Sequence, residues 1–249
     1  MQKTVLITGV SRGIGRACAL AFAKAGYSVA GCCHTRTELL SSPAEELNAL
    51  SCEHYLTAGD IANPNFVTSF FAETVRRFGH LDLLINNAGI SVIGLLTDLS
   101  NEDWYRLMSV NLSSAFFCCR TAVPYFLSNR TEKEDTRLGA ILNVSSVWGC
   151  SGASCEAAYS ACKGGLNALT QALAKELAPS RIPVNALACG CIDTDMNRCF
   201  SEEEKNALCE EIPAGRFATP EEVAQALLLL SQMPDYMTGQ VIRFDGGFL

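Results

Sequence analysis

The sequence has no cluster of lysine and arginine, and no apolar run long enough to cross a lipid bilayer. Its 249 residues carry 19 Lys+Arg against 26 Asp+Glu, a net charge of -7, which speaks against binding to nucleic acid or to an anionic membrane. The longest apolar run near the C-terminus, Ala226–Leu230, is far too short for a membrane span. The N-terminal MQKTVLITG leads directly into a strand-like segment, so we expect no signal peptide and a soluble, cytoplasmic protein.

A Cys-x-x-Cys pair is also missing, although the sequence contains 13 cysteines. The three histidines, His34, His54 and His80, do not lie at zinc-ligand spacings from any cysteine, so we expect no metal site. Without a secretion signal, the thiols are expected to be reduced and to act as small apolar side chains.

Short apolar runs alternate with longer amphipathic stretches along the whole chain. We expect strands at Lys3–Ile7, Ser28–Cys32, Glu53–Thr57, Leu81–Ile85, Ala140–Val144, Ile182–Leu187 and Gln240–Phe244. We expect helices at Gly13–Ala25, Pro43–Leu50, Phe66–Phe78, Asn101–Leu127, Cys155–Ala178, Ser201–Glu210 and Pro220–Leu230. Strands separated by helices of this length form right-handed crossovers and a parallel sheet covered on both faces.

No linker rich in proline, glycine or serine interrupts this alternation. The pattern therefore predicts an α/β fold of the Rossmann type, doubly wound, with a seven-stranded parallel sheet flanked by helices, in a single domain over residues 1–249. The charged stretch SNRTEKEDTR, residues 128–137, is expected to be a solvated surface loop.

A glycine cluster, Thr8–Gly15, lies between the first expected strand and the first expected helix. This is the place where a doubly wound fold binds phosphate, because glycines permit a tight turn and the helix N-terminus offers unpaired N–H groups. A glycine cluster alone can be a simple turn, but its position in a βαβ unit predicts dinucleotide binding.

The end of the second strand indicates which dinucleotide is bound. A NAD site usually has Asp or Glu about twenty residues after the glycine loop, bonded to the ribose 2′-hydroxyl. Here no acid occurs before Glu38, while Arg36 lies in this region and Arg12 lies in the loop. Either guanidinium can pair with a 2′-phosphate, so the sequence predicts NADP(H), unless both are ordinary surface arginines.

With these motifs the sequence resembles the classical short-chain dehydrogenase/reductase family over nearly its whole length. Thr8–Gly15 matches the glycine motif of that family, Asp60 its adenine-contacting acid, and Asn86–Gly89 its stabilising motif after the fourth strand. The catalytic residues implied by the resemblance are Asn111, Ser146, Tyr159 and Lys163. The cofactor-binding residues it implies are Gly9, Ser11, Arg12, Gly13, Ile14, Gly15, Arg36, Asp60, Ile61, Asn87, Ala88, Gly89, Tyr159, Lys163, Gly190, Ile192 and Thr194.

The spacing of two of these residues makes chemical sense by itself. Tyr159 and Lys163 are four positions apart on an expected helix and so share a face. An ammonium beside a phenol lowers the pKa of the phenol, and Tyr159 could then donate a proton to a carbonyl oxygen as hydride reaches the carbon. The resemblance implies that Ser146 holds the same oxygen, that Lys163 grips the ribose hydroxyls and that Asn111 positions a water.

The C-terminal stretch IPAGRFATPEEVAQALLLL resembles the 3-oxoacyl-[acyl-carrier-protein] reductase branch of this family, which implies a homotetramer and a carrier-bound substrate. Arg137 matches one of two basic positions that dock the acidic carrier in that branch. The other position is Ser180, with Arg181 adjacent. The acidic insert near Arg137 could repel a carrier. The segment Cys191–Ile212 is expected to cover the substrate.

One departure from the family pattern is Cys189, where a proline is usual after the sixth strand. The missing proline removes one fixed φ angle near the nicotinamide, and the thiol could make the site sensitive to thiol reagents. Two other functions stay open from the sequence. One is oxidation or reduction of another alcohol or ketone, such as a hydroxysteroid, a sugar or a small carbonyl compound; the other is a catalytically silent NADP(H)-sensing module.

Overall fold

The computed structural model describes residues 2–34, 36–129, 137–197 and 201–249. Within them, seven strands form one parallel sheet in the order β3-β2-β1-β4-β5-β6-β7. The strands are β1 (Thr4–Thr8), β2 (Ser28–Cys33), β3 (His54–Ala58), β4 (Leu83–Asn86), β5 (Ala140–Ser146), β6 (Val184–Cys189) and β7 (Val241–Phe244). The order reverses between β1 and β4, so the predicted doubly wound fold is confirmed.

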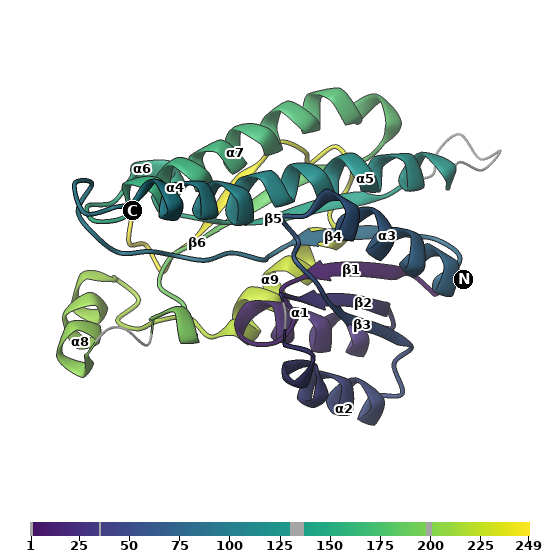
Figure 1. Ribbon diagram of the computed structural model, residues 1–249, viewed down its shortest axis with the longest axis horizontal. Coiled ribbons are helices and arrows are strands. Elements are labelled where there is room, and N and C mark those ends of the chain that lie inside the picture. The colour runs from purple at the N-terminus through teal and green to yellow at the C-terminus, as the bar shows by residue number, and fades with distance from the viewer. Residues whose placement is uncertain (1, 35, 130–136, 198–200) are drawn as a thin grey trace.

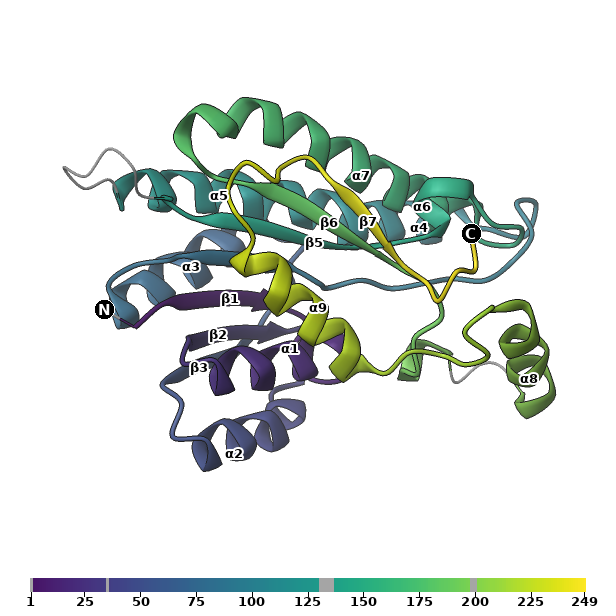
Figure 2. The ribbon, with the colours of Figure 1, turned by 180° about the vertical axis from the view of Figure 1, so that it is seen from behind.

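Helices cover both faces of this sheet. One face is covered by α1 (Gly13–Lys24), α2 (Ser41–Ala49) and α9 (Pro220–Gln232). The other is covered by α3 (Pro64–Phe78), α5 (Ser114–Ser128) and α7 (Ala157–Leu177). Figures 1 and 2 show the two layers from opposite sides, with α8 (Glu202–Glu211) beyond the end of the sheet. No helix among the described residues is long and apolar enough to cross a membrane.

The two core layers follow from the alternation of side chains along each strand. Val5 and Ile7 of β1 belong to the layer that contains Phe22 of α1, whereas Leu6 belongs to the layer that contains Phe70 of α3. All five side chains are at most 1% exposed. Because both faces of the sheet are covered, the strand sequences are continuous apolar runs and do not alternate between apolar and polar residues.

The two ends of α3 show how the sequence determines where a helix begins and ends. Asn63 caps its first turn by accepting a hydrogen bond from the Asn65 N–H, and Pro64 occupies the first helical position, where no N–H is needed. Gly79 ends the helix in the left-handed region with φ 84°, as its position in the sequence predicted.

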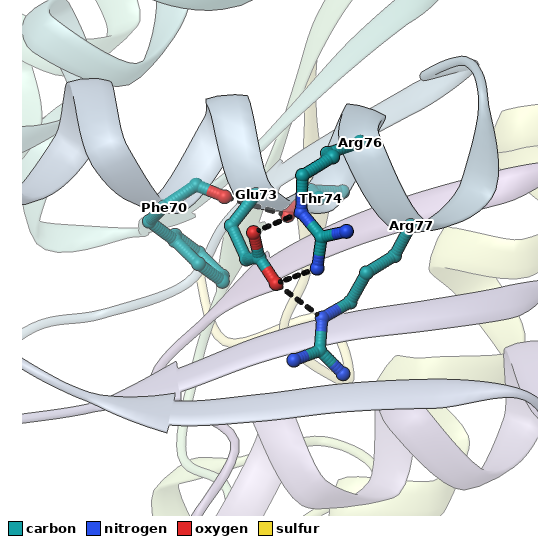
Figure 3. Close-up of polar contacts among 5 residues, drawn as sticks. All are labelled: Phe70, Glu73, Thr74, Arg76 and Arg77. Carbon is teal, nitrogen blue, oxygen red and sulfur yellow. Dashed lines mark hydrogen bonds and ion pairs between the residues drawn. The ribbon is translucent and has the colours of Figure 1, made fainter.

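The exposed face of α3 carries a three-residue charge cluster. Figure 3 shows Glu73 accepting hydrogen bonds from Arg76 and Arg77, at 2.6 Å from each Nε. These bonds lower the pKa of Glu73 to about 2. The Arg77 guanidinium also lies 4.3 Å from the ring centroid of Tyr55 on β3, which links the helix to the outermost strand.

The long helix expected over Asn101–Leu127 differs from the prediction. It consists of α4 (Asn101–Met108), a π-helical turn η2 (Ser109–Ser113) and α5, which contains Pro124. A π turn inserts one extra residue into a helix and is common at functional sites. Of the stretch expected as a charged loop, residues 130–136 lie outside the described residues.

Candidate active site

The glycine loop between β1 and α1 is closely packed against the loop that follows β4. Gly9 has φ 79°, and a Cβ on it would lie 3.1 Å from the Cα of Ala88. A Cβ on Gly15 would lie 2.0 Å from the Gly9 carbonyl oxygen, and Gly13 has φ 55°. Glycine is therefore required at positions 9 and 15, and it avoids backbone strain at position 13.

The predicted stabilising motif fixes this loop through side-chain bonds. Asn87 donates through Nδ2 to the carbonyl oxygens of Thr8 and Gly9, at 2.9 and 3.1 Å. In return, the Thr8 hydroxyl accepts from the N–H groups of Asn87 and Ala88. The structure thus brings the loops after β1 and β4 together, as predicted.

The N-terminus of α1 offers a cradle for an anion. Its N-cap residue, Arg12, makes no side-chain capping bond, so the N–H groups of the first turn have no partner within the helix. Together with the helix dipole and the glycines, such N–H groups suit the pyrophosphate of a dinucleotide. Ser11 precedes Arg12 in this loop, and Ile14 packs against the core layer of α1.

The residues expected near the adenosine lie at the ends of β2 and β3. The Gly9 and Val10 N–H groups donate to the carbonyl oxygen of Cys32, so the glycine loop adjoins the end of β2. Arg36 is exposed beyond that strand. Asp60 follows β3, is 47% exposed and accepts a hydrogen bond from the Ala62 N–H. Its neighbour Ile61 is buried.

Arg12 has a partner that the sequence did not reveal. Its Nη1 lies 3.3 Å from a carboxylate oxygen of Asp195, in the segment that follows β6, and its side chain is 71% exposed. In that segment Thr194 also contacts the loop, since its Cγ2 is 3.4 Å from the Cβ position of Gly13. The expected cofactor-binding residues Gly190 and Ile192 are anchored by Phe244 and by a bridge to Ala218.

Three of the four predicted catalytic residues come from β5 and α7. Ser146 is the last residue of β5, and its Oγ accepts from the Trp148 N–H at 3.2 Å. Its hydroxyl acts to lower the pKa of Tyr159, against the larger effect of burial. Lys163 lies one turn further along α7, with Nζ 5.6 Å from the Tyr159 ring centroid. The spacing of tyrosine and lysine on one helix face is therefore confirmed.

The fourth residue, Asn111, belongs to the π turn η2. Its Oδ1 accepts from the Ile90 N–H at 2.8 Å and its Nδ2 donates to the Ile90 carbonyl oxygen at 2.9 Å. A Cβ placed on Gly89 would lie 2.9 Å from Asn111 Oδ1 and 3.7 Å from Lys163 Nζ. Asn111 and Lys163 thus lie on either side of the same glycine.

The pKa values of this cluster differ from the expectation. Burial lowers the pKa of Lys163 to about 8, and its Nζ donates to the Val144 carbonyl oxygen at 2.8 Å. Burial, and then the charges of Glu156 and Cys189, raise the pKa of Tyr159. The prediction that the pKa of the phenol is lowered is wrong for this arrangement, because burial is the largest influence on Tyr159 and raises its pKa.

Cys189, which replaces the usual proline, ends β6 and is 5% exposed. Burial raises the pKa of its thiol to about 12, although Lys163 acts in the opposite direction. Because the thiolate is the reactive form, the structure favours an unreactive thiol over the expected sensitivity to thiol reagents.

Comparison with known proteins places this geometry in a family. Residues 9–249 match the family model described as "Enoyl-(Acyl carrier protein) reductase". The chain is 38% identical over 248 residues to "3-oxoacyl-[acyl-carrier-protein] reductase FabG" of Staphylococcus aureus (strain Mu50 / ATCC 700699), covering 99% of this chain and 98% of that protein. It is 37% identical over 255 residues to "Uncharacterized oxidoreductase YmfI" of Bacillus subtilis (strain 168), covering 100% and 99%.

A solved structure gives the same result. A short-chain type dehydrogenase/reductase from Mycobacterium marinum superimposes with a TM-score of 0.89 at 29% identity, over 99% of this chain and 95% of that one. The chain belongs to the short-chain dehydrogenase/reductase family. It is therefore an oxidoreductase that acts on CH–OH or carbonyl groups and binds a nicotinamide cofactor.

One residue of this oxidoreductase site was missed by the sequence reasoning. Glu156 is the N-cap residue of α7, three positions before Tyr159, and its Oε1 accepts from the Ser91 hydroxyl at 2.8 Å. Burial is the main cause of the raised pKa values of Tyr159 and Cys191, and the charge of Glu156 adds to both shifts. The only signal in the sequence was an acidic residue, Glu156, at the start of the helix that contains Tyr159.

Arg137, expected to dock a carrier protein, has a structural role in this oxidoreductase. Its guanidinium donates to the backbone carbonyl oxygens of Gly139, Ser231 and Met233. The second expected docking position, Ser180, lies in a short 3-10 turn, and the adjacent Arg181 lies 3.7 Å from Asp235. Arg137 therefore fastens the end of α9, and docking of a carrier at this residue stays a prediction.

Proposed function

We propose that this chain is an NADPH-dependent ketoreductase, a single cytoplasmic domain over residues 1–249. The observation that carries the proposal is the cluster at the carboxyl end of β5, where Ser146 ends the strand and Lys163 Nζ donates to the Val144 carbonyl oxygen at 2.8 Å and lies 5.6 Å from the Tyr159 ring centroid. Two adjacent hydroxyls can hold one carbonyl oxygen, and the one with the raised pKa stays protonated and ready to donate. The absence of an acid after β2, with Arg12 and Arg36 nearby, supports NADPH over NADH.

When bound, the nicotinamide would supply hydride. The protein would hold the pyrophosphate on the N–H groups of the first turn of α1. Asp60 and Ile61 would lie at the adenine. The residues toward the nicotinamide would be Asn87–Gly89, Gly190, Ile192 and Thr194. Lys163 would bind ribose hydroxyls with the ammonium that now bonds Val144.

During reduction Ser146 would hold the substrate oxygen while Tyr159 donates its phenolic proton to that oxygen. Asn111, fixed to the backbone of Ile90, would position a water near Lys163 and return the proton from solvent. The names of the 3-oxoacyl-[acyl-carrier-protein] reductases with which the chain shares 38% identity support a 3-oxoacyl substrate of fatty acid synthesis as the first candidate. The homotetramer stays a prediction from the family resemblance.

The test is NADPH consumption with ketone substrates by wild type and by Tyr159→Phe. Loss of a positioned general acid lowers kcat by at least about a hundredfold. NADPH binding, measured by fluorescence titration, should stay within about twofold of wild type, an allowance of less than 0.5 kcal/mol. Tyr236→Phe is the matched control, because Tyr236 is 97% exposed. Cofactor binding without any turnover by the wild type would leave the silent sensing module as the function.

A further inference from the structure

A contact between two sulfur atoms binds the π turn that carries Asn111 to the helix that carries the catalytic tyrosine. Cys162, on α7, donates its thiol hydrogen to the Sδ of Met108 at 3.4 Å. Cys162 directly precedes Lys163, and Met108 directly precedes the π turn η2. The contact therefore joins the two segments that hold Lys163 and Asn111, at positions close to both residues along the chain.

The Cys162 side chain is in a state that allows this bond. It is 0% exposed, and burial raises the pKa of its thiol, so the thiol stays protonated and can donate its hydrogen. A thioether sulfur such as that of Met108 accepts a hydrogen bond only weakly. The bond therefore adds direction to a packing contact and contributes little energy by itself.

A small apolar cluster surrounds the two sulfur atoms. Its buried members are Leu107, Ala158 and Cys162, and the partly buried side chains that pack against them include those of Met108 and Tyr159. This cluster is separate from the two main core layers of the sheet. A change at the sulfur contact is therefore expected to act on the predicted catalytic residues before it acts on the packing of the sheet.

A second close approach holds the π turn against α7. A Cβ on Gly165 would lie 2.8 Å from Cδ2 of Leu112, which belongs to the turn. A glycine inside a helix weakens that helix relative to alanine, but here the missing side chain leaves room for Leu112. Met108 and Leu112 thus attach the turn to α7 before and after Asn111 in the chain.

The hydrogen bonds of Asn111 do not by themselves fix its distance from Lys163. The amide of Asn111 is bonded to the backbone of Ile90, in the loop after β4, whereas the ammonium of Lys163 is bonded to the Val144 carbonyl oxygen on β5. A water held between the amide and the ammonium requires a constant separation of the two, and small displacements in such an arrangement cost rate. The contacts between the turn and α7 supply that constraint.

We propose that Cys162 is a positioning residue, which through Met108 holds the π turn on α7 so that the Asn111 amide stays within reach of the Lys163 ammonium. This inference rests on the proposed function, in which Asn111 and Lys163 return the proton through a water. In this role the thiol acts on proton return and not on the binding of ketone or cofactor.

The test measures ketone reduction with NADPH by Cys162→Ala, which removes the thiol, and by Met108→Leu, which removes the acceptor at nearly constant volume. Each variant should lower kcat by about fivefold, which corresponds to about 1 kcal/mol, and keep both KM values within about twofold of wild type. The double variant should be as slow as each single one, because both substitutions remove the same contact. The solvent isotope effect on kcat should increase in all three, since proton return becomes slower.

An Asn111→Ala background separates positioning from a loss of packing. Because Cys162 acts through Asn111, adding Cys162→Ala to that background should change kcat by less than about twofold. Cys118→Ala is the matched control. Cys118, on α5, is also 0% exposed but belongs to the core layer of α3, so this variant removes the same sulfur atom from the interior and should keep the wild-type kcat and isotope effect.

The outcomes separate the two proposals. Wild-type kcat in both single variants, effects that add in the double variant, or a fivefold loss that persists in the Asn111→Ala background overturns the positioning role and leaves the ketoreductase intact. An equal loss in Cys118→Ala does the same. Met108→Leu in both backgrounds decides the question if loss of the Cys162 thiol prevents folding. Binding of NADPH without reduction of any ketone, including a 3-oxoacyl thioester, overturns the proposed function and the positioning role together.

Discussion

Reversing the charge of Arg137 tests its structural role at the end of α9. The guanidinium donates to three backbone carbonyls, two of which, those of Ser231 and Met233, lie at the end of α9. In Arg137→Glu these carbonyls lose their donors, and a carboxylate faces the negative end of the helix dipole. Hydrogen bonds from charged groups contribute about 1.5–3 kcal/mol each and are not additive, so with partial exposure we expect a net loss of about 3 kcal/mol.

For a chain of this size, 1 kcal/mol shifts Tm by roughly 2–4 °C, so Arg137→Glu should unfold about 6–12 °C below wild type. Differential scanning calorimetry measures this directly, with Arg181→Glu as the control, because Arg181 is a 41%-exposed arginine at the other expected docking site. We expect its Tm to stay within about 2 °C of wild type, since exposed ion pairs contribute little. A wild-type Tm for Arg137→Glu, combined with a raised KM for a carrier-bound substrate only, would refute this reasoning and restore the docking role.

Three further predictions concern cofactor choice, thiol chemistry and pH. NADPH should exceed NADH in kcat/KM by at least about tenfold, and Arg12→Ala should reduce that ratio; an unchanged ratio would assign the preference to Arg36. Iodoacetamide at neutral pH should label exposed Cys150 well before Cys189, whose thiol pKa is about 12, as peptide mass spectrometry would show; the reverse order would contradict the burial of Cys189. Burial lowers the pKa of Lys163 from 10.5 to about 8, so between these pH values the unfolded state binds more protons and the free energy of unfolding of wild type rises with pH. Lys163→Met lacks this dependence. In urea titrations, the excess of its unfolding free energy over that of wild type should therefore shrink by about 3 kcal/mol from pH 7 to pH 10.5.

The strands and most helices could be predicted from the sequence because their signals are local. An apolar run identifies β1, and Asn63, Pro64 and Gly79 mark the ends of α3 within a few residues. The tetrad was also predictable, since its spacing on one helix and its place after a strand are properties of short segments. Tyr159 and Lys163 share a face of α7, as that reasoning requires, with Nζ 5.6 Å from the ring centroid.

What could not be predicted depends on contacts between distant parts of the chain. Arg137 and Ser231 are 94 positions apart, and Arg12 and Asp195 are 183 positions apart, so no local pattern reveals either contact. The predicted direction of the Tyr159 pKa shift was wrong for the same reason. It depends on burial and on where the Lys163 ammonium points, and a sequence gives neither.

The π turn at Ser109–Ser113 makes this part of the chain intolerant of a change in length. It inserts one residue into an otherwise continuous helix from Asn101 to Ser128, and Asn111 reaches the backbone of Ile90 from this insertion. Each residue of a helix turns the chain by about 100°, so deleting one residue there would convert the π turn into regular helix and rotate everything on one side of it. The amide of Asn111 would then leave Ile90, although every other side chain of α4 and α5 would be unchanged in identity. Substitutions would be tolerated in this helix far more readily than single-residue insertions or deletions, because the register of the two halves is what places the catalytic amide.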